Sequence, residues 1–310
     1  MGTKEKIFVA GHRGLVGSAI VKKLQQKGYT NLILKTHDQL DLLNQQAVAD
    51  FFEAEKPEKV FLAAAKVGGI LANKQQKADF IYKNLQIQNN VIYNCYKHKV
   101  NKLLFLGSSC IYPRNCAQPI KEEYLLTGPL EQTNDAYAIA KIAGITMCQS
   151  FNQQYKTNFI SAMPTNLYGP NDNFDPETGH VLPALIRKFH EAKQTGAPAV
   201  ILWGTGTVYR EFLHVDDLAD VLLFLMQSYN NSEIINVGTG TDITIKDLAE
   251  TIKEITGYEG QITWDKTKPD GTPKKLLDVT KLNNLGWKAK TSLRDGIAQT
   301  YEWYKNNLPK

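Results

Sequence analysis

The chain has 310 residues, of which 43% are hydrophobic and 22% are charged, and its formal charge is +5. This composition fits one large or two medium-sized domains with a substantial core. No apolar run reaches the roughly 18 residues of a membrane span, and the basic residues are not clustered as a nucleic-acid groove requires. We therefore expect no membrane or nucleic-acid partner, and a small anionic ligand instead.

Cysteine and histidine usage gives no sign of a disulfide framework or a metal site. The four cysteines show no CxxC spacing, and the six histidines form no HxxxH or mixed His/Cys cluster. The N-terminus runs into an apolar segment at residues 7–10 without the pattern of a signal peptide. These features predict a cytoplasmic protein with free thiols and no bound metal.

The chain opens with a predicted strand at residues 7–10, a glycine loop and an amphipathic helix that extends to about Lys27. In such a loop the first glycine permits a tight turn, the second lets the backbone approach a pyrophosphate, and the third permits close packing of helix and strand. The helix N-terminus adds partial positive charge for the phosphates. This order predicts a dinucleotide-binding fold. The loop consists of Gly11, His12, Arg13, Gly14, Leu15, Val16 and Gly17.

The second predicted strand, at residues 31–34, ends without the acidic residue that usually binds the ribose hydroxyls of NAD. Lys35 and His37 stand there instead, and Arg13 lies in the glycine loop. Because these groups would attract a 2′-phosphate, we expect NADP. Asp38 as a ribose ligand, or an ordinary charged strand end, are the alternatives. The residues expected beside the adenine are Asp41 and Leu42.

Two further apolar runs, at residues 60–65 and 102–107, predict buried parallel strands. The second run leads directly into Ser108 and Cys110. Ligands of open α/β sheets bind outside the carboxyl ends of the strands. We therefore expect these side chains in a ligand cleft. Other strands are expected at 159–163 and 234–238. Helices are expected at about 44–55, 75–98, 135–155, 181–195, 245–256 and 292–306, with a further helix that Asp216 caps and that extends to about Tyr229.

Tyr137 and Lys141 are separated by four residues on a predicted helix, so their side chains share one face. A nearby ammonium favours the phenolate and would lower the tyrosine pKa toward neutrality. The pair could then act as a general acid–base centre. Taken alone, the spacing also fits an amphipathic helix with a buried tyrosine and a solvated lysine.

Three motifs in this order resemble the extended short-chain dehydrogenase/reductase family: the glycine loop 11–17, the strand end 106–109, and Tyr137-x-x-x-Lys141. The resemblance implies an α/β fold with a Rossmann-type doubly wound parallel sheet and a smaller, discontinuous C-terminal substrate-binding lobe. It implies that Tyr137 donates a proton, that Lys141 tunes it and binds the nicotinamide ribose, and that Ser108 hydrogen-bonds the substrate carbonyl. The NADP-binding domain would comprise residues 1–165 and about 208–238, and the substrate lobe about 166–207 and 239–310.

Within that family the chain is similar to the enzymes that invert C3 and C5 and reduce C4 of GDP-4-keto-6-deoxy-D-mannose. The C4 ketone acidifies the protons on C3 and C5, so inversion needs a base on one face of the sugar and an acid on the other. Cys110 is the expected base and His180 the expected acid. The resemblance also implies a homodimer. The segments that carry it are 11–17, 64–69, 107–113, 179–181, 203–206 and 268–273.

The resemblance assigns two sets of binding residues. The GDP-sugar contacts are expected from Ser108, Lys188, Trp203, Arg210, Asp270 and Lys275. The NADP(H) contacts are expected from Gly11, His12, Arg13, Gly14, Leu15, Val16, Gly17, Lys35, His37, Asp41, Leu42, Leu106, Gly107, Ser108, Ser109, Tyr137, Lys141, Pro164, Thr165, Asn166, Leu167 and His180.

Several of these residues could instead have a purely structural role, and other activities share the same fold. Cys110 could be a packing residue, His180 a helix cap, and Trp203 part of the core. A sugar-nucleotide 4-epimerase or 4,6-dehydratase shares the fold, but a 4,6-dehydratase usually carries an Asp-Glu pair where Ser109 and Cys110 stand. A non-catalytic dinucleotide-binding protein often lacks the Tyr or the Lys, and both are present here.

Overall fold

A six-stranded parallel sheet forms the centre of the larger part of the molecule, in the order β10-β5-β4-β3-β1-β2. The structure is a computed structural model that describes residues 2–268 and 270–307. The chain starts with β1, forms the edge next to it with β2, and then continues on the other side of β1 with β3, β4, β5 and β10. The strands are β1 (Ile7–Ala10), β2 (Leu32–Ile33), β3 (Lys59–Leu62), β4 (Lys102–Leu106), β5 (Phe159–Pro164) and β10 (Ile235–Val237).

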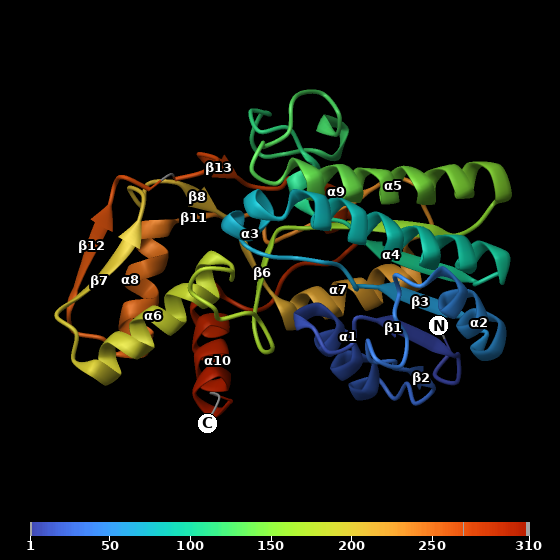
Figure 1. Cartoon of the computed structure of the whole chain (residues 1–310), viewed down its shortest axis with the longest axis horizontal. Coiled ribbons are helices and arrows are strands. Elements are labelled where there is room, and N and C mark those ends of the chain that lie inside the picture. Colours follow the sequence, from blue (N-terminus) through green and yellow to red (C-terminus); the bar gives the residue numbers. More distant parts are fainter. Residues whose placement is uncertain (1, 269, 308–310) are drawn as a thin grey trace.

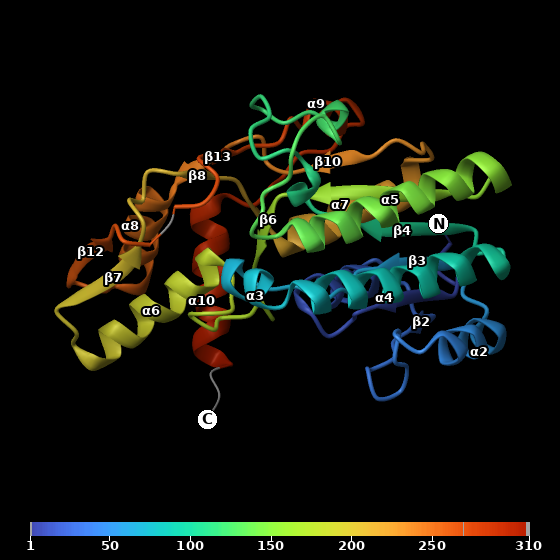
Figure 2. The ribbon, with the colours of Figure 1, turned by 45° about the horizontal axis from the view of Figure 1, so that its top comes forward.

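Helices cover both faces of this sheet (Figures 1 and 2). Their apolar sides pack on strands that are buried on both faces and almost continuously apolar, as parallel strands are. The fold class expected from the sequence, a doubly wound parallel sheet, is therefore confirmed. One face carries α2 (Gln45–Glu55), α4 (Lys77–Lys97) and α5 (Asp135–Tyr155), and the other carries α1 (Leu15–Gln26) and α7 (Val215–Ser228).

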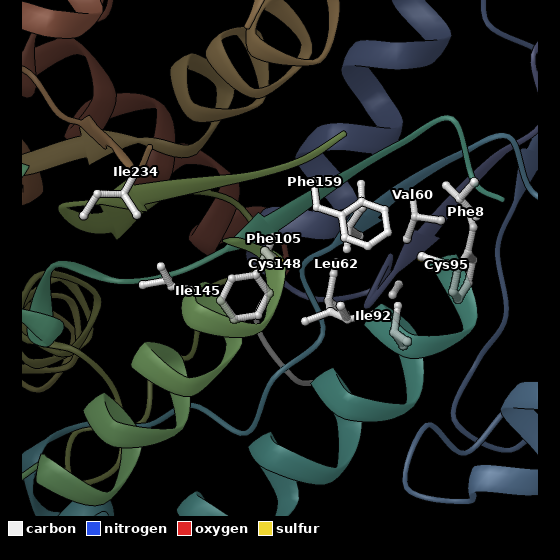
Figure 3. Packing of buried hydrophobic residues seen from close by; sticks show 14 of the residues in the cluster. Phe8, Val60, Leu62, Ile92, Cys95, Phe105, Ile145, Cys148, Phe159 and Ile234 are labelled. Carbon is white, nitrogen blue, oxygen red and sulfur yellow. The ribbon is translucent and has the colours of Figure 1, made fainter. Parts of the chain in front are cut away.

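Figure 3 shows the apolar core between the sheet and the paired helices α4 and α5. Side chains from four strands, among them Phe105 on β4 and Phe159 on β5, meet Ile92 and Cys95 of α4 and Ile145 and Cys148 of α5. All of these side chains are at most 1% exposed. This packing holds α5, the helix that carries Tyr137, against strands β4 and β5.

The helix expected at about 75–98 is α4. A short helix that was not expected, α3 (Ile70–Gln75), precedes it and is separated from it by Gln76, whose ψ of 35° is not helical. The expected cap of α7 is wrong. Asp216 does not cap α7. His214 is the cap, since its Nδ1 accepts a hydrogen bond from Asp216 N at 3.3 Å, while the Asp216 carboxylate binds Lys22 Nζ at 2.8 Å.

A smaller group of elements packs around a third apolar cluster beyond the carboxyl ends of the strands (Figure 1, left). Its helices are α6 (Val181–Thr195), α8 (Ile245–Thr256) and α10 (Leu293–Asn306), and its parallel strand pair is β7 (Ala199–Trp203) with β12 (Gln261–Asp265). The exact division into two domains stays a prediction. The other elements are η1 (Ser109–Ile111), η2 (Glu122–Tyr124), β6 (Asn166–Tyr168), β8 (Tyr209–Arg210), β9 (Phe212–His214), β11 (Ile243–Thr244), β13 (Lys274–Lys275) and α9 (Thr280–Asn284).

Within residues 2–268 and 270–307, none of the helices combines the length and the hydropathy that a membrane span requires.

Candidate active site

A cleft of about 1470 Å³ lies at the carboxyl ends of β1, β3 and β4 and extends to α6 and β7. Sites for one drug-sized ligand have about 300–1,000 Å³, so this cleft has room for a dinucleotide together with a second nucleotide. It lies where the strand order reverses, the usual ligand position in such sheets. Every site residue expected from the sequence lines it except His12 and Arg13.

The glycine loop between β1 and α1 leaves no room for side chains at two positions. Gly11 has φ +85°, and a Cβ on it would lie 2.9 Å from the Ala64 backbone. A Cβ on Gly17 would collide with the Gly11 carbonyl oxygen. Gly14 caps α1 without a side chain, and the first turn of α1 contains no acidic residue. The loop and helix therefore fit the pyrophosphate of a dinucleotide.

Two alanine substitutions in this loop are expected to have different effects. Gly17→Ala should lower the melting temperature, because the collision with the Gly11 carbonyl needs a backbone shift. Gly14→Ala should leave the melting temperature nearly unchanged, because its Cβ would meet only Gly11 O, at an ordinary 3.6 Å. It should still weaken NADPH binding, since the methyl group blocks the backbone approach. Thermal unfolding measures the stability of both variants, and titration with NADPH measures their affinity for the cofactor. An equal loss of stability in both variants would contradict the expected difference.

The end of the cleft expected to hold the 2′-phosphate contains fewer free cations than the sequence suggests. Lys35 Nζ already pairs with Glu55 Oε1 at 3.0 Å, and this ion pair lowers the pKa of Glu55. The His37 side chain is 76% exposed and lies 3.7 Å from Asp41. Arg13 is exposed but lies outside the cleft lining. His37 is thus the exposed basic group that lines this end.

Tyr137 and Lys141 project from the same face of α5 toward the end of β4. Lys141 Nζ donates a hydrogen bond to Leu106 O at 2.7 Å and lies 5.6 Å from the centre of the Tyr137 ring. Burial lowers the pKa of Lys141 to about 8. Burial also raises the pKa of Tyr137, and the neighbouring Cys110 raises it further. The expectation that Lys141 lowers this pKa is wrong here, since the ammonium bonds a backbone carbonyl and desolvation of the phenol dominates. A protonated phenol suits a proton donor.

Ser108 and Cys110 follow β4 at the centre of the cleft. Ser108 Oγ accepts a hydrogen bond from Cys110 N at 3.3 Å, which begins the short helix η1. Cys110 is 7% exposed, and its charge would influence the pKa values of Tyr137, Lys141 and Lys275. The thiol is therefore close to both ammonium groups and to the phenol. A role in packing alone would not account for the position of the thiol beside these titratable groups.

His180 immediately precedes α6 but does not cap it with its side chain. The residue as a whole is exposed to the cleft, but desolvation lowers the pKa of its imidazole, and Lys275 lowers it further. The helix-cap alternative holds for the backbone alone: His180 occupies the N-cap position of α6, and its carbonyl oxygen accepts a hydrogen bond from Ala184 N at 3.1 Å. Lys275, expected at the GDP end, lies near both Cys110 and His180. The sequence could not show this, because β13 is 165 residues from Cys110 along the chain.

The opposite end of the cleft offers an aromatic face surrounded by cations. Trp203 is 50% exposed, and the Nζ atoms of Lys188 and Lys268 each lie 5.6 Å from its ring centre. Trp203 is thus not a core residue. Arg210 lines the cleft beside it while its guanidinium donates to Thr272 O at 2.6 Å. An aromatic face with nearby cations fits a base and its diphosphate.

The Asp270 side chain forms hydrogen bonds within the protein that the sequence did not show. Its carboxylate accepts hydrogen bonds from Thr205 N at 2.7 Å and from Thr205 Oγ1 at 2.9 Å. The side chain thereby ties the segment after β12 to the end of β7. Asp270 also lines the cleft, so its predicted contact with the GDP-sugar stays a prediction.

The segment that precedes His180 contains a buried carboxyl group that sequence reasoning missed. Asp172 Oδ2 is buried and has no hydrogen-bond partner among the described residues, and burial raises the pKa of Asp172 to about 7. The same segment docks on the loop after β3 through Gly69 N and Thr178 O at 2.8 Å. Its many polar residues signalled a turn-rich loop but not this burial.

Asp172→Asn is expected to reduce the pH dependence of stability. A folded-state pKa above the ordinary 3.8 means that the folded protein binds the proton more tightly, so stability falls as pH rises from about 4 to about 7. The shift corresponds to about 4 kcal/mol at most, and local opening of the loop reduces it. The variant should be more stable than the wild type near pH 8 and differ less near pH 5. Urea unfolding at both pH values checks this; a variant less stable near pH 8 would contradict it.

The described residues contain no group of three or more His, Cys, Asp or Glu side chains placed to ligate a metal ion.

Comparison with known proteins gives a consistent family assignment. The family model for the NAD dependent epimerase/dehydratase family matches residues 7–238. The chain is 63% identical to "Putative GDP-L-fucose synthase 2" of Arabidopsis thaliana over 303 residues, which cover 98% of this chain and 92% of the relative.

Two solved structures are similar over nearly the whole chain. A GDP-6-OMe-4-keto-L-xylo-heptose reductase from C. jejuni aligns with a TM-score of 0.94 and 46% identity, covering 99% of each chain. A GDP-L-fucose synthetase from Naegleria fowleri bound to NADP aligns with a TM-score of 0.92 and 30% identity, covering 99% of this chain and 96% of the other. The chain therefore belongs to the NAD dependent epimerase/dehydratase family.

Proposed function

We propose that the chain is a GDP-L-fucose synthase, which inverts C3 and C5 of GDP-4-keto-6-deoxy-D-mannose and reduces its C4 ketone with NADPH. The observation that carries this proposal is the grouping of Cys110 and Tyr137 around one position in the cleft, with Lys141 and Lys275 close to the thiol. The 63% identical GDP-L-fucose synthase and the NADP-bound structure support it. A reductase alone would need the tyrosine and lysine but no thiol.

The inversion needs a carbonyl that accepts charge, a base and an acid. Ser108 and Tyr137 donate hydrogen bonds to the substrate O4 and stabilise the enolate. The Cys110 thiolate, held beside two ammonium groups, takes the proton from the carbon next to the ketone. His180, whose lowered pKa makes its imidazolium a stronger acid, returns a proton to the opposite face.

The reduction uses the same carbonyl site. NADPH supplies the hydride to C4 when it is bound. Tyr137 supplies the proton to O4, and the raised pKa of its phenol keeps that proton in place until the oxygen becomes negative. Lys141, anchored by Leu106 O, places positive charge next to the phenol. One arrangement of donors thus serves an enolate first and an alkoxide afterwards.

The direct assay supplies GDP-4-keto-6-deoxy-D-mannose with NADPH and follows the loss of NADPH absorbance. We expect one NADPH to be consumed per molecule of GDP-L-fucose formed, and NADPH to support faster turnover than NADH. The matched control is Tyr137→Phe, which should oxidise NADPH about 10²–10⁴-fold more slowly than the wild type. Absence of NADPH consumption by the wild-type protein would overturn the proposal.

We also propose that the protein is a cytoplasmic homodimer that pairs through α4 and α5. These helices lie side by side on the outside of the sheet (Figures 1 and 2) and expose several large apolar or aromatic side chains. Light scattering at working concentration tests the pairing; a mass of 34.8 kDa would contradict it. The exposed residues are Tyr82, Tyr93, Ile139 and Tyr155.

A further inference from the structure

A second, smaller cavity of about 40 Å³ adjoins the main cleft at Cys110. Its lining extends from the buried Cys110 and Tyr112 to Arg114, which is exposed on the surface. A volume of about 10–15 Å³ is enough for one water molecule. The cavity can therefore hold water between the thiol and the solvent. The residues that line both this cavity and the main cleft are Ser109, Cys110, Arg114, Glu131, Asn134, Thr272 and Lys275.

Asn134 is the residue of this shared wall whose conformation has no structural explanation within the protein. It precedes α5, where an asparagine side chain normally accepts a hydrogen bond from the first turn, yet it makes no such cap. Its Oδ1 atom is buried and has no partner among the described residues. A buried acceptor without a partner destabilises the folded protein. Asn134 lines the small cavity, and a rotation of its amide toward that cavity would bring the acceptor to a water molecule there.

Asn134 also belongs to the same cleft as the catalytic pair. It is the residue immediately before α5, the helix that carries Tyr137 and Lys141, and all three residues line the main cleft. The same wall contains Cys110 and Lys275. An acceptor at this point is therefore next to the groups that hold and move protons.

The proposed chemistry requires such a path if one thiolate serves two carbons. In the first inversion the C–H bond breaks, its electron pair becomes part of the enolate, and the proton forms an S–H bond on Cys110. His180 has meanwhile given its own proton to the carbon. Before the second inversion the thiol must therefore release its proton to water, and His180 must take one up. The bound sugar, enclosed between the two nucleotides, excludes water from the main cleft at that stage.

We propose that Cys110 releases its proton into the small cavity, and that Asn134 Oδ1 holds the water molecule that accepts it. Asn134 is thus a positioning residue for proton release. The inference rests on the proposed function, because it needs a thiolate base that is used more than once in each turnover. It predicts a defect in the second inversion and none in hydride transfer.

The test replaces Asn134 with leucine, which has nearly the same size and no acceptor. With GDP-4-keto-6-deoxy-D-mannose and NADPH, we expect the ratio of singly inverted to doubly inverted reduced product to rise about tenfold, equivalent to about 1.4 kcal/mol between competing barriers. NADP-dependent oxidation of GDP-L-fucose, which begins with hydride transfer, should keep its initial rate. Asn134→Ser, which leaves room and a hydroxyl for water, should restore the wild-type ratio.

Asn94→Leu is the matched control, because Asn94 Oδ1 is also buried without a partner but lies on α4 outside both cavities. It should give wild-type products. An unchanged product ratio in a folded Asn134→Leu protein would overturn the inference; Asn134→Val provides the same test if the leucine variant does not fold. Failure of the wild-type protein to form any doubly inverted product would instead overturn the proposed function.

Discussion

Replacing Tyr137 with phenylalanine is expected to lower the rate of ketone reduction by about 10²–10⁴-fold, the usual contribution of a positioned general acid. The hydroxyl is the group that the cleft keeps protonated, since burial raises its pKa, and its ring packs edge-on against Phe80 with centres 6.2 Å apart. Phenylalanine preserves that packing, so folding and NADPH binding should remain. Stopped-flow measurement of NADPH oxidation separates hydride transfer from binding.

Tyr124→Phe provides a control for the loss of a tyrosine hydroxyl. Tyr124 lies in η2 and outside the lining of the cleft, so its variant should react like the wild type. A Tyr137→Phe protein that reduces the ketone within a few-fold of the wild-type rate would show that another group donates the proton. The Tyr137–Lys141 pair would then have no catalytic role.

Cys110→Ser is expected to have the second large effect, on inversion rather than on reduction. A serine hydroxyl is a far weaker acid than a thiol and does not ionise near neutral pH, so the base is lost. Entry of deuterium from D2O at C3 and C5 should slow by about 10²–10⁴-fold. NADP-dependent oxidation of GDP-L-fucose should keep its initial rate, because Ser108, Tyr137 and Lys141 remain in place. Mass spectrometry and proton NMR measure the exchange.

Cys116→Ser is the control, since Cys116 is a free thiol on the loop after η1 that lines neither cavity. It should exchange deuterium like the wild type. Exchange at the wild-type rate in Cys110→Ser would exclude Cys110 as the base. Loss of exchange at only one carbon would assign the other carbon to a different base.

Local sequence patterns were sufficient to predict the elements that build the cofactor half of the cleft. The glycine loop, the strand before Ser108 and the Tyr137–Lys141 spacing each depend on residues close together in the chain. Their positions relative to the sheet follow from the order of parallel strands, which the structure confirms. The short helix α3 was not predicted. Only Gln76 separates it from α4, and no proline or glycine marks that break.

The contacts between distant segments could not be predicted in the same way. Lys275 approaches Cys110 and His180 only because β13 pairs with β8 next to Arg210. The direction of the Tyr137 pKa shift depends on burial by surrounding elements, whereas the sequence shows only the adjacent lysine. Asp172 and Asn134 have ordinary loop and helix-start residue types, and only the fold shows that an oxygen of each is buried without a partner.

The central claim is that one site both inverts two carbons and reduces a third. The most direct measurement is proton NMR of the product that the wild-type protein forms from GDP-4-keto-6-deoxy-D-mannose and NADPH in D2O. The account predicts GDP-L-fucose with deuterium at C3 and C5 and with the hydrogen at C4 derived from NADPH. A reduced product that keeps the original configuration and the original protons at C3 and C5 would contradict it, and would identify a C4 reductase in which Cys110 and His180 have no catalytic role.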